Sequence, residues 1–121
     1  MGKDLAQKYP KAQALFDQAN ETLDYNLAQI CFEGPEDALT QTENAQPGIF
    51  LVSWIALELL QEQAPDLIFE AAAGLSLGEF TALTAAGTMS FEEGLKVVRQ
   101  RGRFMQEACD ATGGGMAAII G

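Results

Sequence analysis

The sequence is constrained most strongly by a Gly-x-Ser-x-Gly motif at residues 74–78, which lies between an apolar stretch and a run of small residues. The mainly apolar residues 66–73 (DLIFEAAA) before it predict a short strand, with Glu70 as a strand-end or partnered carboxylate, and residues 79–86 after it predict a helix. On such a sharp strand-to-helix turn, the glycines avoid clashes with neighbouring backbone, and the serine hydroxyl is exposed at the start of the helix. The pattern therefore predicts an α/β fold with Ser76 at the turn.

Ser76 would gain as a nucleophile from the helix that follows it. The backbone N–H groups and the dipole at a helix N-terminus favour developing negative charge. The N–H of Leu77 would then be a donor of an oxyanion hole. The competing interpretation is a glycine-rich turn in which the serine only caps the helix. The strand and helix expected on either side favour the nucleophile.

Helices dominate the prediction for the rest of the chain. They are expected at residues 4–9, from residue 10 onwards, at 24–32, 35–39 and 44–64, and at 90–108. Pro47 should lie in the first turn of the fifth of these, and Ser90 and Glu93 fit a capping box that starts the last. The apolar residues 116–120 predict a second strand.

The composition excludes several classes of function. With 17 Asp and Glu against 7 Lys and Arg, the net charge of −10 argues against nucleic acid and anionic membrane surfaces as partners. Cys31 and Cys109 have no metal-ligand spacing, and no signal peptide or membrane span is evident. A cytoplasmic protein without a metal site is expected. The chain contains no histidine, the side chain best suited to move protons near neutral pH.

Four segments of the chain resemble, in order, segments of the malonyl-CoA:acyl-carrier-protein transacylases and related polyketide acyltransferase domains. Residues 74–83 (GLSLGEFTAL) resemble the family's GHSLGE(Y/F)xAL signature, and Gln46-Pro47 is similar to its TQP segment. Residues 97–106 (VVRQRGRFMQ) resemble the helix with the RGxxMQ motif, and residues 115–121 (GMAAIIG) the strand that opens a small inserted subdomain. The likeness covers nearly the whole chain.

The resemblance implies a helix-rich part of an α/β-hydrolase-like acyltransferase core and a two-step transfer. Ser76 would accept the malonyl group of malonyl-CoA, and the phosphopantetheine thiol of acyl carrier protein would then take it. Leu77 N–H would serve the oxyanion hole, Arg101 would hold the free malonyl carboxylate, and Gln46 would line the same pocket. A planar guanidinium suits a carboxylate, although Arg101 could instead make an ordinary surface ion pair. No bound cofactor is implied.

The chain also departs from the family pattern. Leu75 stands where the family usually has histidine. The family's opening strand and GQGSQ loop have no counterpart before Met1, and its general-base histidine lies further along than Gly121. The resemblance therefore implies a chain truncated at both ends, with residues 1–115 as a partial core and residues 116–121 as the start of a ferredoxin-like subdomain. Such a chain should be inactive alone and dependent on the missing C-terminal half as a partner.

Three other functions are open at this point. The chain could be part of a polyketide synthase acyltransferase domain instead of an enzyme of fatty-acid synthesis. It could be a non-catalytic half that serves as an interaction module, although its acidity disfavours contact with carrier proteins, which are themselves acidic. A generic serine hydrolase is the third alternative, and the segment around Arg101 gives it no support.

Overall fold

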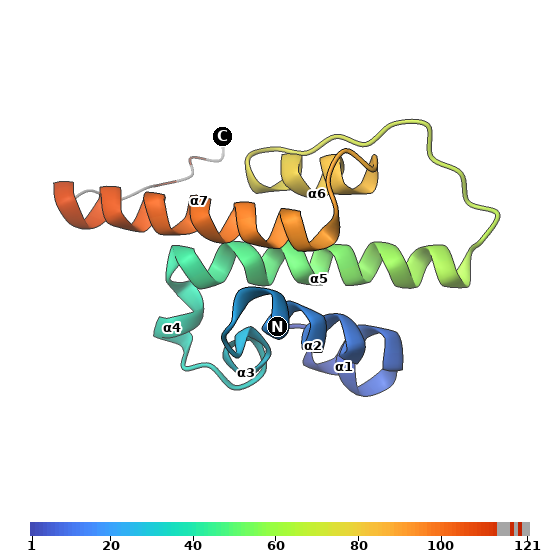
Figure 1. Ribbon diagram of the computed structural model, residues 1–121, viewed down its shortest axis with the longest axis horizontal. Coiled ribbons are helices and arrows are strands. Elements are labelled where there is room, and N and C mark those ends of the chain that lie inside the picture. The colour runs from blue at the N-terminus through green and yellow to red at the C-terminus, as the bar shows by residue number, and fades with distance from the viewer. Residues whose placement is uncertain (114–116, 118, 120–121) are drawn as a thin grey trace.

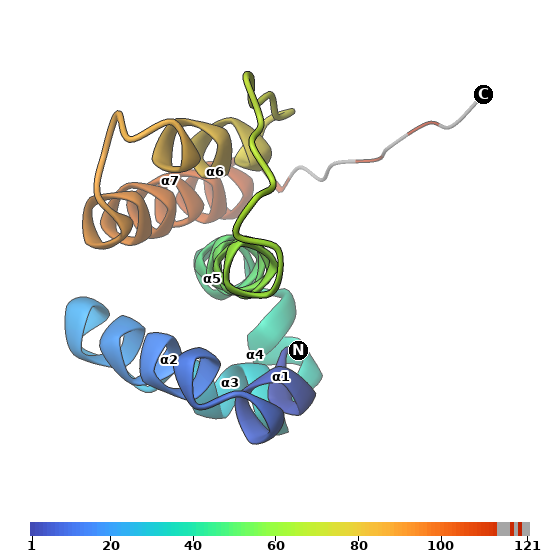
Figure 2. The same ribbon diagram turned by 90° about the vertical axis from the view of Figure 1, so that its right-hand side faces the viewer.

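The computed structural model describes all residues except 114–116, 118 and 120–121, and the described residues form seven helices. Their bounds are α1 (Lys3–Lys8), α2 (Pro10–Leu23), α3 (Leu27–Glu33), α4 (Glu36–Thr40), α5 (Thr42–Gln63), α6 (Leu77–Ala85) and α7 (Phe91–Thr112). Helix α5 lies in the middle, with α1–α4 on one side and α6 and α7 on the other (Figures 1 and 2).

The core lies where α2, α5 and α7 meet. Phe16, Phe50 and Leu95, one from each helix, are completely buried. Gly94 of α7 lets this contact close, because a Cβ there would lie 2.5 Å from Cζ of Phe50. The burial of large apolar side chains is the main stabilising contribution. It also fixes α5 and α7 side by side.

The helices after the motif largely confirm the prediction. The capping box of α7 is present in both directions: Ser90 Oγ accepts from the N–H of Glu93, and the carboxylate of Glu93 accepts from the N–H of Ser90. Gly87, with a φ of 73°, follows α6 as the expected stop.

Helix α5 starts two residues before the predicted residue 44, which is about half a turn. The helix begins at Thr42, so Pro47 lies inside it and not in its first turn. Proline within a helix costs one backbone hydrogen bond. At the start of the helix, the side-chain oxygen of Gln106, from α7, accepts the N–H of Thr42 at 3.4 Å.

The strand predicted at residues 66–73 is also wrong, since no strand forms among the described residues. This segment runs as an extended connection that leaves the end of α5 and returns over α6 (Figure 1). A strand needs another strand as a partner for its backbone groups, whereas the described segments beside residues 69–73 belong to helices α5 and α6. Its apolar side chains are exposed instead, with Ile68 at 85%. Apart from residues 117 and 119, the strand predicted at 116–120 and the subdomain start at 116–121 lie outside the described residues.

Tyr25 follows α2 and packs, partly buried, against the core. The guanidinium carbon of Arg99 lies 4.4 Å from the centre of its ring. The hydroxyl oxygen is buried without a hydrogen-bond partner among the described residues. Burial raises the pKa of Tyr25 to about 12, against the opposing effect of Arg99.

Replacing Tyr25 with phenylalanine should remove a loss of stability at alkaline pH. Because the folded-state pKa is raised, the folded chain keeps a proton that the unfolded chain releases above about pH 10. The free energy of unfolding of the wild type should therefore fall as the pH rises from about 10 towards 12. The variant should lack this part of the loss and be no less stable at pH 7, since it removes an unpaired hydroxyl. Urea unfolding across this pH range measures both, and an identical alkaline loss in the variant would contradict the assignment.

Candidate acyl-transfer site

Ser76 lies at the turn into α6 with an unusual backbone conformation. Its φ is 55° and its ψ is −107°. Residues other than glycine rarely adopt this backbone conformation, which costs about 1–3 kcal/mol. Strain of this kind at a serine before a helix is typical of a nucleophile turn. The alternative, a serine that caps the helix, is not what the structure shows, because the Ser76 side chain makes no cap hydrogen bond.

The two motif glycines differ in their role. A Cβ on Gly74 would overlap the backbone of Gly78, so the turn closes on itself only with glycine at residue 74. A Cβ on Gly78 would meet nothing within 4 Å among the described residues. The expectation that both glycines are sterically required is therefore correct for Gly74 and wrong for Gly78.

The residues on either side of Ser76 are exposed or lie at the helix end. Leu77 is the first residue of α6, where a backbone N–H has no acceptor within its own helix. Leu75 is 89% exposed, so the side chain that replaces the family's histidine packs against little in the described part of the chain.

Arg101 joins the predicted site residues into one cluster. From α7, its Nη2 donates to Ser76 Oγ at 2.8 Å and its Nη1 donates to Gln46 Oε1 at 2.6 Å. The guanidinium carbon lies 5.8 Å from the centre of the Phe80 ring, within range of a cation–π contact. Three residues from α5, α7 and the turn before α6 therefore meet at a single guanidinium.

The guanidinium of Arg101 has no carboxylate partner in the described part of the chain. The ion pairs found there join Lys11 to Glu58 and Arg103 to Glu107. The ordinary surface ion pair considered for Arg101 is thus not formed, in a chain with ten more acidic than basic residues. An arginine whose partners are neutral oxygens can accept an anionic ligand in a bidentate manner.

Gln46 is buried beneath Arg101. Only 6% of the residue is exposed, and it lies on α5 one turn after the helix start. Its amide nitrogen donates to the sulfur of Met105 at 3.0 Å, while its oxygen accepts from Arg101. Gln46 therefore holds the guanidinium of Arg101 from the α5 side.

Two further residues of the segment around Arg101 dock α7 onto α5, and sequence reasoning did not assign them a role. A Cβ on Gly102 would lie 2.5 Å from the carbonyl oxygen of Thr42, so only glycine allows the two backbones this close. Gln106 accepts the N–H of Thr42 and donates to Asp110. The RGxxMQ spacing was the available signal, because residues 102 and 106 are one helical turn apart.

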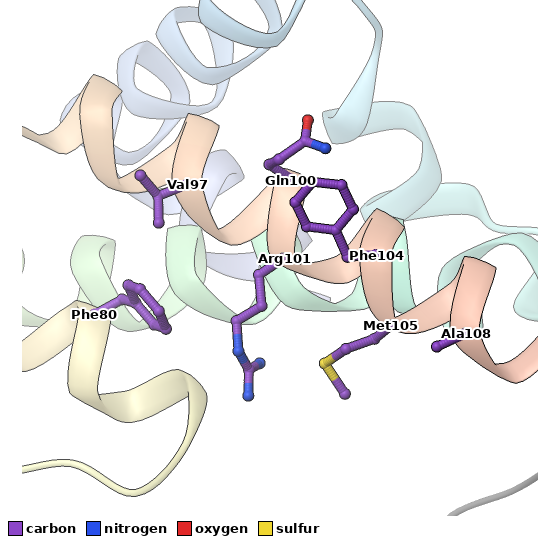
Figure 3. Close-up of a pocket in the computed structure, with 7 residues that line it drawn as sticks. All are labelled: Phe80, Val97, Gln100, Arg101, Phe104, Met105 and Ala108. Carbon is purple, nitrogen blue, oxygen red and sulfur yellow. The ribbon is translucent and has the colours of Figure 1, made fainter.

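An apolar groove of about 500 Å³ lies beside the cluster, between α6 and α7. Figure 3 shows its lining residues, with the side chains of Arg101 and Met105 lying next to each other: Phe80, Val97, Gln100, Arg101, Phe104, Met105 and Ala108. The groove thus offers apolar walls and one cation close to Ser76.

Neither a metal site nor a membrane-spanning helix is found among the described residues. Within residues 1–113, 117 and 119, no three His, Cys, Asp or Glu side chains come together to form a metal site. No described helix is long and apolar enough to cross a membrane.

Comparison with known proteins gives a consistent result. A family model described as "Acyl transferase domain" matches residues 1–120. The chain is 47% identical over 123 residues to the malonyl CoA-acyl carrier protein transacylase of Bacillus subtilis (strain 168), covering all of this chain and 38% of that protein. Its structure is similar to the crystal structure of a malonyl CoA-acyl carrier protein transacylase from Clostridium perfringens, with a TM-score of 0.82 and 36% identity over 89% of this chain and 34% of that one.

A third similar structure contains a partner protein. It is described as a type II polyketide synthase acyl-carrier protein in complex with its malonyl-transacylase, and it matches with a TM-score of 0.82 and 35% identity. The match covers 89% of this chain and 35% of that one. The chain spans about a third of the length of each of these relatives.

Proposed function

The chain belongs to the acyl transferase domain family, and from this premise we propose that it carries the nucleophile and the carboxylate-binding arginine of a malonyl-CoA:acyl-carrier-protein transacylase. The observation that supports this most is the position of Arg101, whose guanidinium contacts both Ser76 Oγ and Gln46 Oε1 and lacks a carboxylate partner among the described residues. A nucleophile and a cation this close suit an acyl group that ends in a second, free carboxylate.

In the first step, Ser76 Oγ attacks the thioester carbonyl carbon of malonyl-CoA. The Oγ–C bond forms, the C–S bond breaks, and coenzyme A leaves as the thiol. The N–H of Leu77, at the start of α6, would stabilise the negative charge on the carbonyl oxygen. The strained backbone of Ser76 supports this role by holding the hydroxyl at the helix start.

The serine proton requires a base that this chain does not contain. In the family this base is a histidine, and none of the 121 residues is histidine. An unassisted serine is a weak nucleophile at neutral pH. We therefore propose that this chain, taken alone, does not turn over, and that the base comes from a further part of the enzyme.

Arg101 would select the acyl group. The malonyl carboxylate would take up the guanidinium in a bidentate manner, with Gln46 supporting it from α5. An acetyl group offers no carboxylate and would leave the cation without its partner, which disfavours it.

In the second step, the phosphopantetheine thiol of acyl carrier protein would take the malonyl group from Ser76. The partner is proposed from the family, and the complex of a related transacylase with its carrier protein supports it. The substrates are thus malonyl-CoA and acyl carrier protein, with no bound cofactor invoked and a cytoplasmic site of action proposed. Fatty-acid synthesis is the first candidate pathway, and polyketide synthesis, to which that same complex belongs, is the second.

The finer fold assignment is proposed on the same basis. In the complete enzyme, residues 66–73 would find a strand partner in an α/β-hydrolase-like sheet, after which Ser76 would stand at a strand-to-helix turn. Residues 1–115 would belong to this core, and residues 116–121 would begin the small ferredoxin-like subdomain. The exposure of Ile68 supports a missing neighbour at this segment.

Titration of the isotope-labelled chain with malonyl-CoA and with acetyl-CoA tests the proposed selectivity without requiring turnover. We expect the side-chain NMR signals of Arg101 to shift with malonyl-CoA and to stay unchanged with acetyl-CoA. Arg103, which is exposed and pairs with Glu107, is the internal control and should respond to neither. Equal shifts of Arg101 with both ligands, or a response of Arg103 only, would contradict carboxylate recognition by Arg101.

A further inference from the structure

The side-chain amide of Gln46 lies between a hydrogen-bond donor, Arg101, and a hydrogen-bond acceptor, Met105. On one side, Arg101 Nη1 donates to its oxygen at 2.6 Å, and on the other its nitrogen donates to Met105 Sδ at 3.0 Å. The residue is 6% exposed, so water offers little compensation for a contact that is lost. The buried amide therefore depends on these two neighbours.

These partners allow only one orientation of the amide. A guanidinium has donors and no acceptor, whereas a thioether sulfur accepts and has no hydrogen to donate. If the amide of Gln46 were turned by 180°, its NH₂ group would face the donors of Arg101 and its oxygen would face the sulfur of Met105. Both contacts would then be lost, and a buried donor left unpaired costs more than a hydrogen bond contributes.

The two partners come from the same face of α7. Arg101 and Met105 are four residues apart, one helical turn, so both side chains lie against the same part of α5. Figure 3 shows them next to each other on this face. The contacts form a directed chain in which Met105 accepts from Gln46, Gln46 accepts from Arg101, and Arg101 donates to Ser76.

We propose that Met105 is a positioning residue, whose sulfur fixes the amide of Gln46 with its oxygen towards Arg101 and thereby holds the guanidinium beside Ser76. This role rests on the proposed function of Arg101 as the carboxylate-binding residue. It assigns to the sulfur atom a task that an aliphatic side chain of the same size cannot perform. Packing alone would instead require only volume at this position.

Two substitutions separate the acceptor from the volume. Met105→Leu keeps an apolar side chain of similar size and removes the acceptor, and Met105→Gln restores an acceptor oxygen at a similar distance from the backbone. Glu107→Gln, a neighbouring change on α7, is the matched control because the Glu107 side chain is 63% exposed and does not line the groove. The amide signals of Gln46 and the guanidinium signals of Arg101 are followed by NMR in each variant, together with the affinity for malonyl-CoA.

We expect Met105→Leu to shift the Gln46 amide signals, broaden those of Arg101, and weaken malonyl-CoA binding about fivefold or more, as expected for a buried donor left unpaired. Met105→Gln should restore the Arg101 signals and most of the affinity, and Glu107→Gln should change neither the signals nor the affinity. In a Gln46→Leu background, Met105→Leu should cause no further loss, because the amide that it positions is gone.

The outcomes distinguish this proposal from the proposed function. Unchanged Gln46 and Arg101 signals in Met105→Leu, or equal losses in the leucine and glutamine variants, would overturn the positioning role. If the wild type does not bind malonyl-CoA, the proposed function fails, and the NMR signals alone still decide whether Met105 orients the amide.

Discussion

Replacing Gly102 with alanine should push α7 away from the start of α5 and lower the free energy of unfolding by about 1–3 kcal/mol, the usual cost of forcing an extra carbon into a close-packed contact. The added Cβ would lie 2.5 Å from the carbonyl oxygen of Thr42 and 2.9 Å from Cα of Glu43. Both are backbone atoms, so no side chain can turn aside to relieve the overlap. The helices themselves have to move.

The displacement should also disturb the site. Arg101 is the neighbour of Gly102 in sequence, and its contact with Gln46 at 2.6 Å spans the same pair of helices. We expect the Arg101 side-chain signals to lose their wild-type positions in Gly102→Ala. Urea unfolding followed by circular dichroism measures the stability, and NMR measures the contact.

Gly78→Ala is the matched control for this substitution. A Cβ at residue 78 meets nothing within 4 Å among the described residues, and alanine is the better helix former. This variant should keep the stability of the wild type or gain slightly. Equal effects of the two substitutions would show that the close approach at Gly102 is not what holds α7 on α5.

Replacing Arg101 with methionine should abolish the preference for malonyl-CoA over acetyl-CoA. The change keeps most of the length of the side chain and removes the cation. A bidentate contact with a carboxylate comprises two charge-assisted hydrogen bonds of about 1.5 kcal/mol each, which corresponds to about 100-fold in affinity. Binding of malonyl-CoA should weaken by this order, whereas binding of acetyl-CoA should change little or improve.

Arg103→Met is the control for the loss of positive charge. Arg103 carries the same charge two residues further along α7 and pairs loosely with Glu107 at 3.9 Å on the surface. Its removal should leave the preference between the two ligands unchanged. A similar loss in both variants would show that the net charge of the chain, and not the guanidinium beside Ser76, governs malonyl-CoA binding.

Local signals in the sequence predicted much of the helical fold. The capping box at Ser90 and the stop at Gly87 each depend on residues close in sequence, and both are confirmed. The strand at 66–73 was predicted wrongly because it depends on a distant partner, since a strand forms only beside another strand. The start of α5 was predicted two residues late, and there Gln106 of α7 accepts the N–H of Thr42.

In the candidate site, too, the residues within sequence motifs were predicted and the contacts between distant segments were not. The resemblance to the family named Ser76, Gln46 and Arg101, and the structure brings these three side chains together. The contributions of Gly102 and Met105 were not predicted, because the spacing within the RGxxMQ segment does not say which residues of α5 they contact. Their roles became visible only once α7 was seen against α5.

The claim that Ser76 is the acyl acceptor is tested most directly by intact-mass spectrometry after incubation with malonyl-CoA. This chain has no histidine to act as the general base. A chimera provides one from its other part: in it, this chain replaces the matching 38% of the Bacillus subtilis transacylase, and the rest of that enzyme is kept. We predict a malonyl adduct on the chimera that peptide mapping places on Ser76 and that Ser76→Ala abolishes, with no adduct on this chain alone. An adduct that persists in the Ser76→Ala chimera, or a folded chimera that forms none, would contradict the account.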